Sequence, residues 1–332
     1  MGVTLATRAD SLQSATILAC PACASRNCRA TRTVEDSIYT ICECRECHLV
    51  FSDPMVAANS AWYSSSWLYG VRTSHTRVEQ KDQAIPWNFA QALADLRTAS
   101  RGKLLDVGCA EGHFLYLAQK MGFDVTGVDF NPVSLEIARA LLGVSTIYRF
   151  SVEDLANRLG EPAFNVVTIF EVLEHLANPR ETVETIHGLL KPGGKLLLSV
   201  PGSRRWPALF HTEVDAPPHH LTLWTEESLQ ELLERAGFRV IRTCKSPLHS
   251  EDLGFHLKLR LYGAVRAIRR PVRARPVRQN SDPSANGGTA PAKKIPDALR
   301  KLAMTGLTPV CKILSLNPSA GGFTLFAHCE KK

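Results

Sequence analysis

A glycine-rich turn lies between an apolar segment and a predicted helix, and an acidic residue follows about 20 positions later. The apolar segment is 103–107, the turn is 108–112, and a second apolar segment, 124–128, ends at Asp129. The turn begins with Gly108 and ends with Gly112, which carry no Cβ atom and so let the backbone approach a ligand closely. At the end of a strand, the Asp129 carboxylate can accept hydrogen bonds from both hydroxyls of a ribose. The pattern therefore predicts a nucleoside site.

Two further acids restrict the kind of nucleoside. Asp106 precedes the turn and Glu111 lies within it. Carboxylates at these positions would repel a pyrophosphate, and the turn also lacks the G-x-G-x-x-G pattern of dinucleotide sites. They suit a cationic ligand with a free amine. S-adenosylmethionine (SAM) carries both a sulfonium and an ammonium group, so the sequence favours SAM.

Residues 106–112, D-V-G-C-A-E-G, resemble the first motif of the class I SAM-dependent methyltransferases, which typically reads D-x-G-C-G-x-G. Ala110 replaces the usual glycine. The run V-L-E-H-L-A-N-P at 172–179 is similar to that of small-molecule methyltransferases in this family. The resemblance covers about residues 17–250 and the last strand. It implies methyl transfer to an oxygen or carbon of a small-molecule acceptor, such as a sugar, a lipid-linked glycan or a secondary metabolite.

The resemblance also assigns residues to parts of the cofactor. Asp106, Gly108 and Glu111 would bind the methionine moiety, and Asp129 the ribose. Adenine would lie against 151–153, where Ser151 replaces the family's usual acid and Glu153 or Asp154 is the substitute. Phe170 and Glu171 would line the site near the sulfonium. The complete set expected to bind the cofactor is Asp106, Gly108, Cys109, Glu111, Gly112, Asp129, Phe130, Ser151, Val152, Glu153, Phe170 and Glu171.

Two adjacent histidines, His219 and His220, follow the predicted fifth strand, on the acceptor side of such a fold. The pKa of a histidine lies near working pH, so either could remove a proton from an acceptor hydroxyl during methyl transfer. One of the pair could instead cap the next helix or order the loop. Glu174 and His175 could also serve as acid–base groups, but we favour a role in ordering their own loop.

Six of the ten cysteines fall between residues 20 and 47. Two C-x-x-C pairs supply four thiolates, those of Cys20, Cys23, Cys44 and Cys47. This spacing predicts a tetrahedral structural zinc with no open position, with strands at 31–34 and 37–41 and a closing turn at 51–54. Cys42 is the alternative to Cys44, His48 is a possible substitute ligand, and Cys28 is spare. A disulfide framework is disfavoured if the compartment is reducing.

Alternation of strands and helices predicts an α/β fold with a doubly wound, seven-stranded, mostly parallel sheet of the Rossmann-like methyltransferase type and a small N-terminal zinc ribbon. The expected strands are 103–107, 124–128, 145–150, 164–170, 195–200, 238–244 and 322–329. The expected helices include 85–96, 132–142, 182–190 and 226–236. We expect the last strand to be antiparallel to its neighbour.

Five regions are expected along the chain: a zinc ribbon at 17–54, a helical lid or linker at 55–100, the methyltransferase core at 101–250, a basic and partly disordered insertion at 251–320, and the final core strand at 321–332. Aromatic residues are dense between 55 and 100, which fits either a lid or packing between ribbon and core. The insertion should contain helices at 253–268 and 295–316.

Charge is concentrated in the insertion. Residues 255–301 hold twelve Lys and Arg against two acids, whereas the whole chain is +7, so the remainder is about −3. A core of that charge makes nucleic acid an improbable partner, and the fourth motif is not of the N-P-P-Y type. The insertion could be a solvated hairpin, a contact with anionic membrane, or an RNA contact, in that order. An RNA methyltransferase and a non-catalytic scaffold are the alternative functions. Lacking an apolar run of about 18 residues, the protein should be cytoplasmic.

Overall fold

The computed structural model describes residues 19–34, 37–58, 84–204, 215–248, 313 and 321–332. The chain divides into two compact units, one comprising residues 1–205, 214–246 and 321–332, the other 206–213 and 247–320. The second unit lies almost wholly outside the described residues, as do the predicted helices at 253–268 and 295–316. The described helices and strands accordingly belong almost entirely to the first unit. Within the described ranges, no helix has the length and apolarity needed to cross a bilayer.

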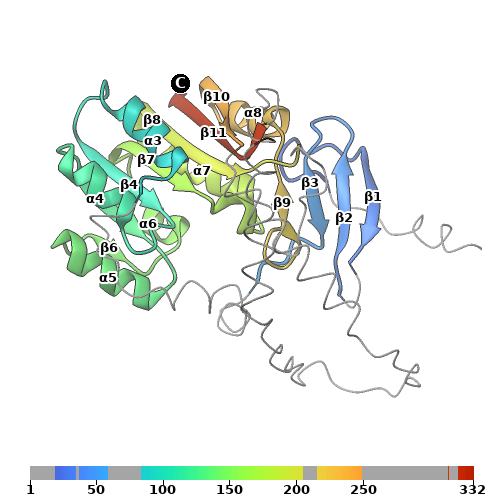
Figure 1. The fold of residues 1–332 in the computed structure, drawn as a ribbon, viewed down its shortest axis with the longest axis horizontal. Helices are drawn as coiled ribbons and strands as arrows, with labels where there is room; N and C mark the ends of the chain where they lie inside the picture. Colours follow the sequence, from blue (N-terminus) through green and yellow to red (C-terminus); the bar gives the residue numbers. More distant parts are fainter. Residues whose placement is uncertain (1–18, 35–36, 59–83, 205–214, 249–312, 314–320) are drawn as a thin grey trace, which may run out of the picture. The chain divides into compact units, whose positions relative to one another are not determined.

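In the described part of the first unit, seven strands form one sheet in the order β10-β11-β8-β7-β4-β5-β6 (Figure 1). The pairs from β8 to β6 are parallel, and β11 is antiparallel to β8, as predicted for the last strand. The strand bounds are β4 Lys103–Val107, β5 Asp124–Val128, β6 Ile147–Tyr148, β7 Phe164–Phe170, β8 Leu190–Pro201, β10 Phe238–Pro247 and β11 Gly321–Lys331.

Four of the α-helices connect successive parallel strands, one precedes β4 and one precedes β10, and each buries apolar residues. Their bounds are α3 Trp87–Leu96, α4 His113–Lys120, α5 Pro132–Leu142, α6 Val152–Leu159, η3 Leu173–His175, α7 Pro179–Leu189 and α8 Glu226–Arg235. Asn131 caps α5 as predicted, accepting hydrogen bonds from two first-turn amides. The third parallel strand is shorter than predicted because β6 is an edge strand that pairs only with β5 in the described sheet.

A second sheet contains the N-terminal cysteines. Within the described residues its order is β1-β2-β3-β9, with β1 Cys28–Thr33, β2 Thr40–Cys44, β3 Val50–Asp53 and β9 Thr222–Leu223. The turn predicted at 51–54 is wrong, because residues 50–53 form β3. Phe51 pairs with Cys42 on one side and Thr222 on the other, and its side chain is fully buried. Strand β9 comes from far along the sequence and completes this sheet (Figure 1).

Side-chain contacts also join the cysteine-rich sheet to the seven-stranded unit. The Arg180 guanidinium donates to the carbonyl oxygen of Ala22 at 3.1 Å, and the Thr225 hydroxyl donates to that of Cys47 at 3.2 Å. Thr225 is also the N-cap of α8. Both acceptors belong to the loops that carry the predicted zinc ligands, so these hydrogen bonds fix the cysteine loops against α7 and α8.

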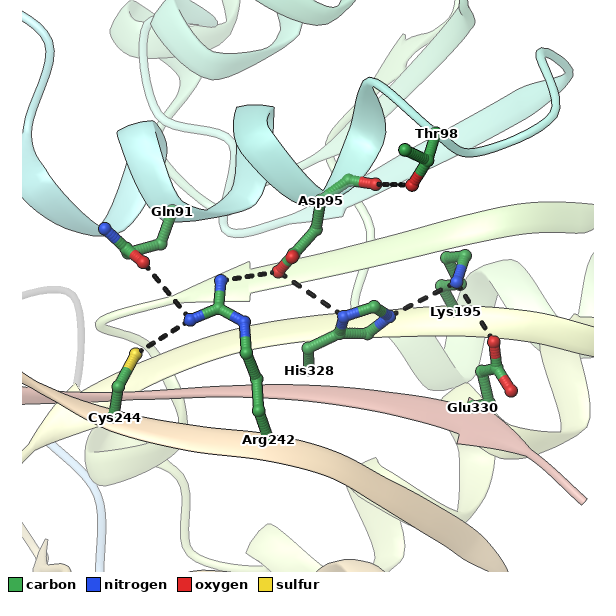
Figure 2. A network of polar contacts seen from close by, with 8 residues as sticks. All are labelled: Gln91, Asp95, Thr98, Lys195, Arg242, Cys244, His328 and Glu330. Carbon is green, nitrogen blue, oxygen red and sulfur yellow. Dashed lines mark hydrogen bonds and ion pairs between the residues drawn. The ribbon is translucent and has the colours of Figure 1, made fainter.

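A polar network fixes α3 on the edge strands (Figure 2). Arg242 on β10 donates to Asp95 on α3 at 2.8 Å, and the Asp95 carboxylate also lies 3.4 Å from Nδ1 of His328 on β11. Lys195 on β8 lies 3.3 Å from Nε2 of His328 and 3.0 Å from Glu330. Burial lowers the pKa of His328. Helix α3 is thus attached to the sheet by both apolar and charged contacts. The lid predicted for 55–100 lies mostly outside the described residues.

Replacing Gly108 by alanine should destabilise the fold more than the same change at Gly143. Both residues have positive φ, +76° and +64°, but a Cβ at Gly108 would lie 2.3 Å from Val172 Cγ2, whereas one at Gly143 would meet nothing within 4 Å. Gly143→Ala should therefore lower the free energy of unfolding by the cost of the left-handed backbone alone, about 1–2 kcal/mol. Gly108→Ala should lower it by more, as measured by urea unfolding. Adding Val172→Ala should recover only the steric part. Equal losses at the two glycines would contradict this steric explanation.

Candidate active site

The glycine turn lies at the carboxyl ends of β4 and β5, the edge where doubly wound sheets bind ligands. The amides of Gly108 and Cys109 both donate to the carbonyl oxygen of Val128, at 2.8 and 3.0 Å. Gly108, Ala110 and Gly112 all have positive φ. Ala110 therefore adopts the backbone expected of the glycine it replaces, at a cost in conformational energy. The buried side chain of Cys109 lies beneath the turn, beside Gly127.

Asp129 is held in a fixed orientation at the end of β5. Its Oδ2 accepts from the amide of Ala110 at 3.0 Å, and its Oδ1 accepts from the amide of Asn131 at 2.8 Å. Each carboxylate oxygen retains a further lone pair for a second donor. Phe130, the next residue, is 65% exposed, and Glu111 is also exposed on the turn. The Asp129 carboxylate and the Phe130 ring are thus adjacent in the sequence, and the hydrogen bond from Ala110 brings the turn to the same edge of the sheet.

Asp106 is a buried acid near the end of β4. Its Oδ1 accepts a 2.6 Å hydrogen bond from the hydroxyl of Thr168 on β7. Burial raises the pKa of the carboxyl to about 7, the negative charge of Asp129 adds to this, and the Thr168 hydrogen bond opposes it. Asp106 therefore changes protonation near neutral pH, which the sequence pattern did not indicate.

The side chains predicted to contact adenine are engaged within the protein. The Ser151 hydroxyl accepts from the amide of Asp154, and the Asp154 carboxylate accepts from that of Ser151, which closes a capping box on α6. Glu153 accepts from the Thr182 hydroxyl on α7 at 2.9 Å. Amides in the first turn of a helix, such as that of Val152, have no acceptor within the helix. The main chain here is the better candidate for contacting a heterocycle.

Phe170 is the last residue of β7 and Glu171 follows it, beside residues of α3. The Phe170 ring packs against Phe89 and Phe114, with centroids 5.2 and 4.9 Å apart. Glu171 has a φ of +54°, which is strained for a residue with a Cβ atom, and accepts from the Ser199 hydroxyl at 2.8 Å. Asn88 in turn donates to Ser199 at 3.0 Å. Asn88 and Phe89 were not predicted from the sequence, and only the helical periodicity of α3 could have indicated them.

Three histidines from two segments lie together beyond β7. His175 on η3 faces His219 and His220, and their ring centroids are 4.8 and 4.9 Å from its own. The rings of His219 and His220 stack at 4.4 Å. The buried carboxylate of Glu174 lies beneath them, with its Oε1 3.7 Å from Nε2 of His175 and 4.0 Å from Nε2 of His220. The predicted bases and the Glu–His motif therefore belong to a single cluster, which we call the histidine cluster (Glu174, His175, His219, His220).

The four predicted zinc ligands are brought together. The Sγ atoms of Cys20, Cys23, Cys44 and Cys47 all lie within 4.8 Å of one another, and the Cys20–Cys47 and Cys23–Cys44 pairs are 3.5 Å apart. Cys44, rather than Cys42, completes the set. Tetrahedral coordination with metal–sulfur bonds of about 2.3 Å would separate the sulfurs by about 3.8 Å, so these residues fit a zinc ion.

The two cysteine loops are geometric copies of each other. Ala24 and His48, each directly after the second cysteine of its pair, have φ of +61° and +62°. The amide of Ala24 donates to the carbonyl oxygen of Cys20 at 2.9 Å, and the amide of His48 donates to the carbonyl oxygen of Cys44 at 3.0 Å. His48 therefore supplies the left-handed turn, and its side chain is not part of the ligand group.

Residues 79–243 match a family model described as "Methyltransferase domain". A ubiquinone biosynthesis O-methyltransferase of Xanthomonas euvesicatoria is 41% identical over 113 residues, covering 32% of this chain and 46% of the relative. One from Alkalilimnicola ehrlichii is 40% identical over 101 residues, covering 29% and 40%. The matched regions thus span about half or less of these relatives.

Among solved structures, a SAM-dependent methyltransferase from Archaeoglobus fulgidus aligns with a TM-score of 0.46 and 18% identity, covering 73% of this chain and 94% of that one. The family match covers the five parallel strands β4 to β8, part of β10, the glycine turn and Asp129, whereas β11 lies outside it. Residues 79–243 therefore form a methyltransferase domain.

Proposed function

We propose that the protein transfers the methyl group of SAM to a hydroxyl oxygen of a small-molecule acceptor. The observation that carries this proposal is the Asp129 carboxylate, fixed by the amides of Ala110 and Asn131 and close to a second acid, Asp106. Such a site is suited to a cationic nucleoside. The names of the matched relatives, which describe O-methyltransferases, support oxygen as the methylated atom.

The residues present fit the cofactor. In this proposal Asp129 accepts hydrogen bonds from the ribose hydroxyls, and Asp106, Gly108 and Glu111 surround the methionine part. The exposed ring of Phe130 and the first-turn amides of α6 contact adenine, in place of the carboxylate of Glu153. Cys109 and Gly112 shape the turn, and Phe170 and Glu171 line the site near the sulfonium.

Bound SAM supplies an electrophilic methyl group on a sulfonium. The protein's contribution is chiefly to hold the acceptor oxygen in line with that methyl group. The aromatic rings of Phe89, Phe114 and Phe170 exclude water from one side of the site. A hydroxyl acceptor must also lose its proton, and we propose that His219 or His220 accepts it.

We propose that Cys20, Cys23, Cys44 and Cys47 bind a structural zinc ion. All four ligands come from the protein, so the ion would take no part in the reaction. It would stabilise the two cysteine loops that Arg180 and Thr225 contact.

We further propose that the protein is cytoplasmic and that its basic insertion, 251–320, contacts anionic membrane. Such a contact would suit a lipid-linked acceptor.

Removing the Asp129 carboxylate should weaken SAM binding by about 100-fold or more, because two hydrogen bonds to a charged acceptor, each contributing about 1.5–3 kcal/mol, are lost. Isothermal titration calorimetry of Asp129→Ala measures this. Asp124→Ala, at the exposed opposite end of β5, is the matched control and should bind normally. Absence of SAM binding to the unmodified protein, or equal affinity in both variants, would refute the cofactor site.

SAM binding should weaken as pH falls through about 7. The cofactor's ammonium group favours ionised Asp106, so binding competes with protonation of that carboxyl, whose pKa burial raises to about 7. The dissociation constant should be about tenfold higher near pH 6 than near pH 8, with a proton released on binding at the lower pH. Asp106→Asn should abolish this dependence and Asp124→Asn should retain it. A flat profile in the unmodified protein would contradict the role given to Asp106.

Loss of a zinc ligand should remove thiolate coordination, whereas loss of the spare cysteine should not. Cobalt-substituted protein should show thiolate-to-cobalt charge-transfer absorption that disappears in Cys47→Ser and persists in Cys28→Ser. Cys28 lies next to the cluster, opposite Cys44 in the sheet, and is the matched control. Persistence of the absorption in Cys47→Ser would show that the ligand set is wrong.

A further inference from the structure

We infer that the histidine cluster is a second metal site, which binds a divalent transition-metal ion through His175, His219 and His220. One ring nitrogen from each of the three imidazoles lies within 4.8 Å of the other two. Three imidazoles with an open position form a ligand set typical of catalytic zinc and related ions. The cysteine-rich sheet has a complete ligand set of its own, so the two sites would be separate.

The orientation of two rings supports this assignment. Nδ1 of His175 lies 2.6 Å from the carbonyl oxygen of His219, which can only accept, so Nδ1 carries the hydrogen and Nε2 has the lone pair in the neutral ring. Nδ1 of His220 faces Oδ1 of the buried Asp215 at 3.7 Å. Metal-bound histidines are commonly oriented in this way, with a carbonyl or carboxylate facing the nitrogen that does not bind the ion.

Charge at the centre of the cluster points in the same direction. Nε2 of His175 and Nε2 of His220 both face Oε1 of Glu174, at 3.7 and 4.0 Å. These distances are longer than a hydrogen bond. The Glu174 side chain is only 1% exposed. A cation among the three imidazoles would lie next to this buried negative charge and would be stabilised by it. Small movements of the rings would bring the nitrogen atoms to coordination distance.

Nitrogen donors select the class of ion. Imidazole suits Zn²⁺, Co²⁺, Ni²⁺ and Fe²⁺, whereas Mg²⁺ prefers oxygen ligands and retains its waters. If the proposed methyl transfer is also correct, an ion here would lower the pKa of an acceptor hydroxyl beside it. The imidazoles would then act as ligands in the metal-bound enzyme, and the cation would replace the base assigned above.

Metal binding is tested on the full chain without any acceptor, so the result is independent of methyl transfer. The unmodified protein should bind two equivalents of Co²⁺, the second without added thiolate charge-transfer absorption. His175→Ala and His220→Ala should each weaken the second equivalent by about 100-fold or more, since even outer-shell partners of a metal contribute 10–100-fold. Mg²⁺ should not compete.

His187→Ala is the matched control, because His187 lies on α7 against Phe238 and outside the cluster. It should retain both equivalents. SAM affinity measured in parallel reports whether each variant is folded. A single equivalent of Co²⁺ in the unmodified protein, or two equivalents of unchanged affinity in a folded His175→Ala variant, would overturn the inference.

Discussion

The backbone N–H and C=O groups of Leu221 connect the cysteine-rich sheet to the loop that follows β7. Its amide donates to the carbonyl oxygen of Glu174 at 2.8 Å, and its own carbonyl accepts from the Ser52 amide at 2.9 Å. The Ser52 hydroxyl adds a second hydrogen bond to that carbonyl. Because Leu221 directly follows His220, these bonds, with the pairing of β9 and β3, set the position of both adjacent histidines. The histidine cluster would lack this support if the cysteine-rich sheet were lost, so that sheet has a structural part in the proposed acceptor side of the site.

The cofactor side and the acceptor side of the proposed site are built by different means. The cofactor side is local: β4, the glycine turn, α4 and β5 are consecutive, and Asp129 is oriented by amides within 20 residues of it. The acceptor side combines η3, the segment before β9 and, through α3, Asn88 and Phe89. Such an assembly depends on contacts between segments that are far apart in the sequence.

This difference explains how far the sequence could predict the structure. The glycine turn, the N-cap at Asn131 and the strand Phe164–Phe170 follow from short-range patterns and are confirmed. The turn predicted at 51–54 is wrong because nothing nearby in the sequence reveals a partner strand about 170 residues away. For the same reason the sequence placed Glu174 and His175 in one group and His219 and His220 in another. Their convergence is a property of the β3–β9 pairing.

The cofactor and acceptor sides also share one packing contact. Gly108 must lack a Cβ because Val172 Cγ2 occupies that space, and Val172 immediately precedes η3, which carries Glu174 and His175. The absence of a side chain at Gly108 thus serves two purposes: it permits the positive φ of the turn, and it lets the loop of the histidine cluster pack directly on the cofactor turn. Since packed interiors transmit small displacements rather than absorb them, a shift of the turn on binding SAM would be felt at His175. The packing of Val172 on the turn is therefore a reason for the glycine at position 108 that ligand binding alone does not supply.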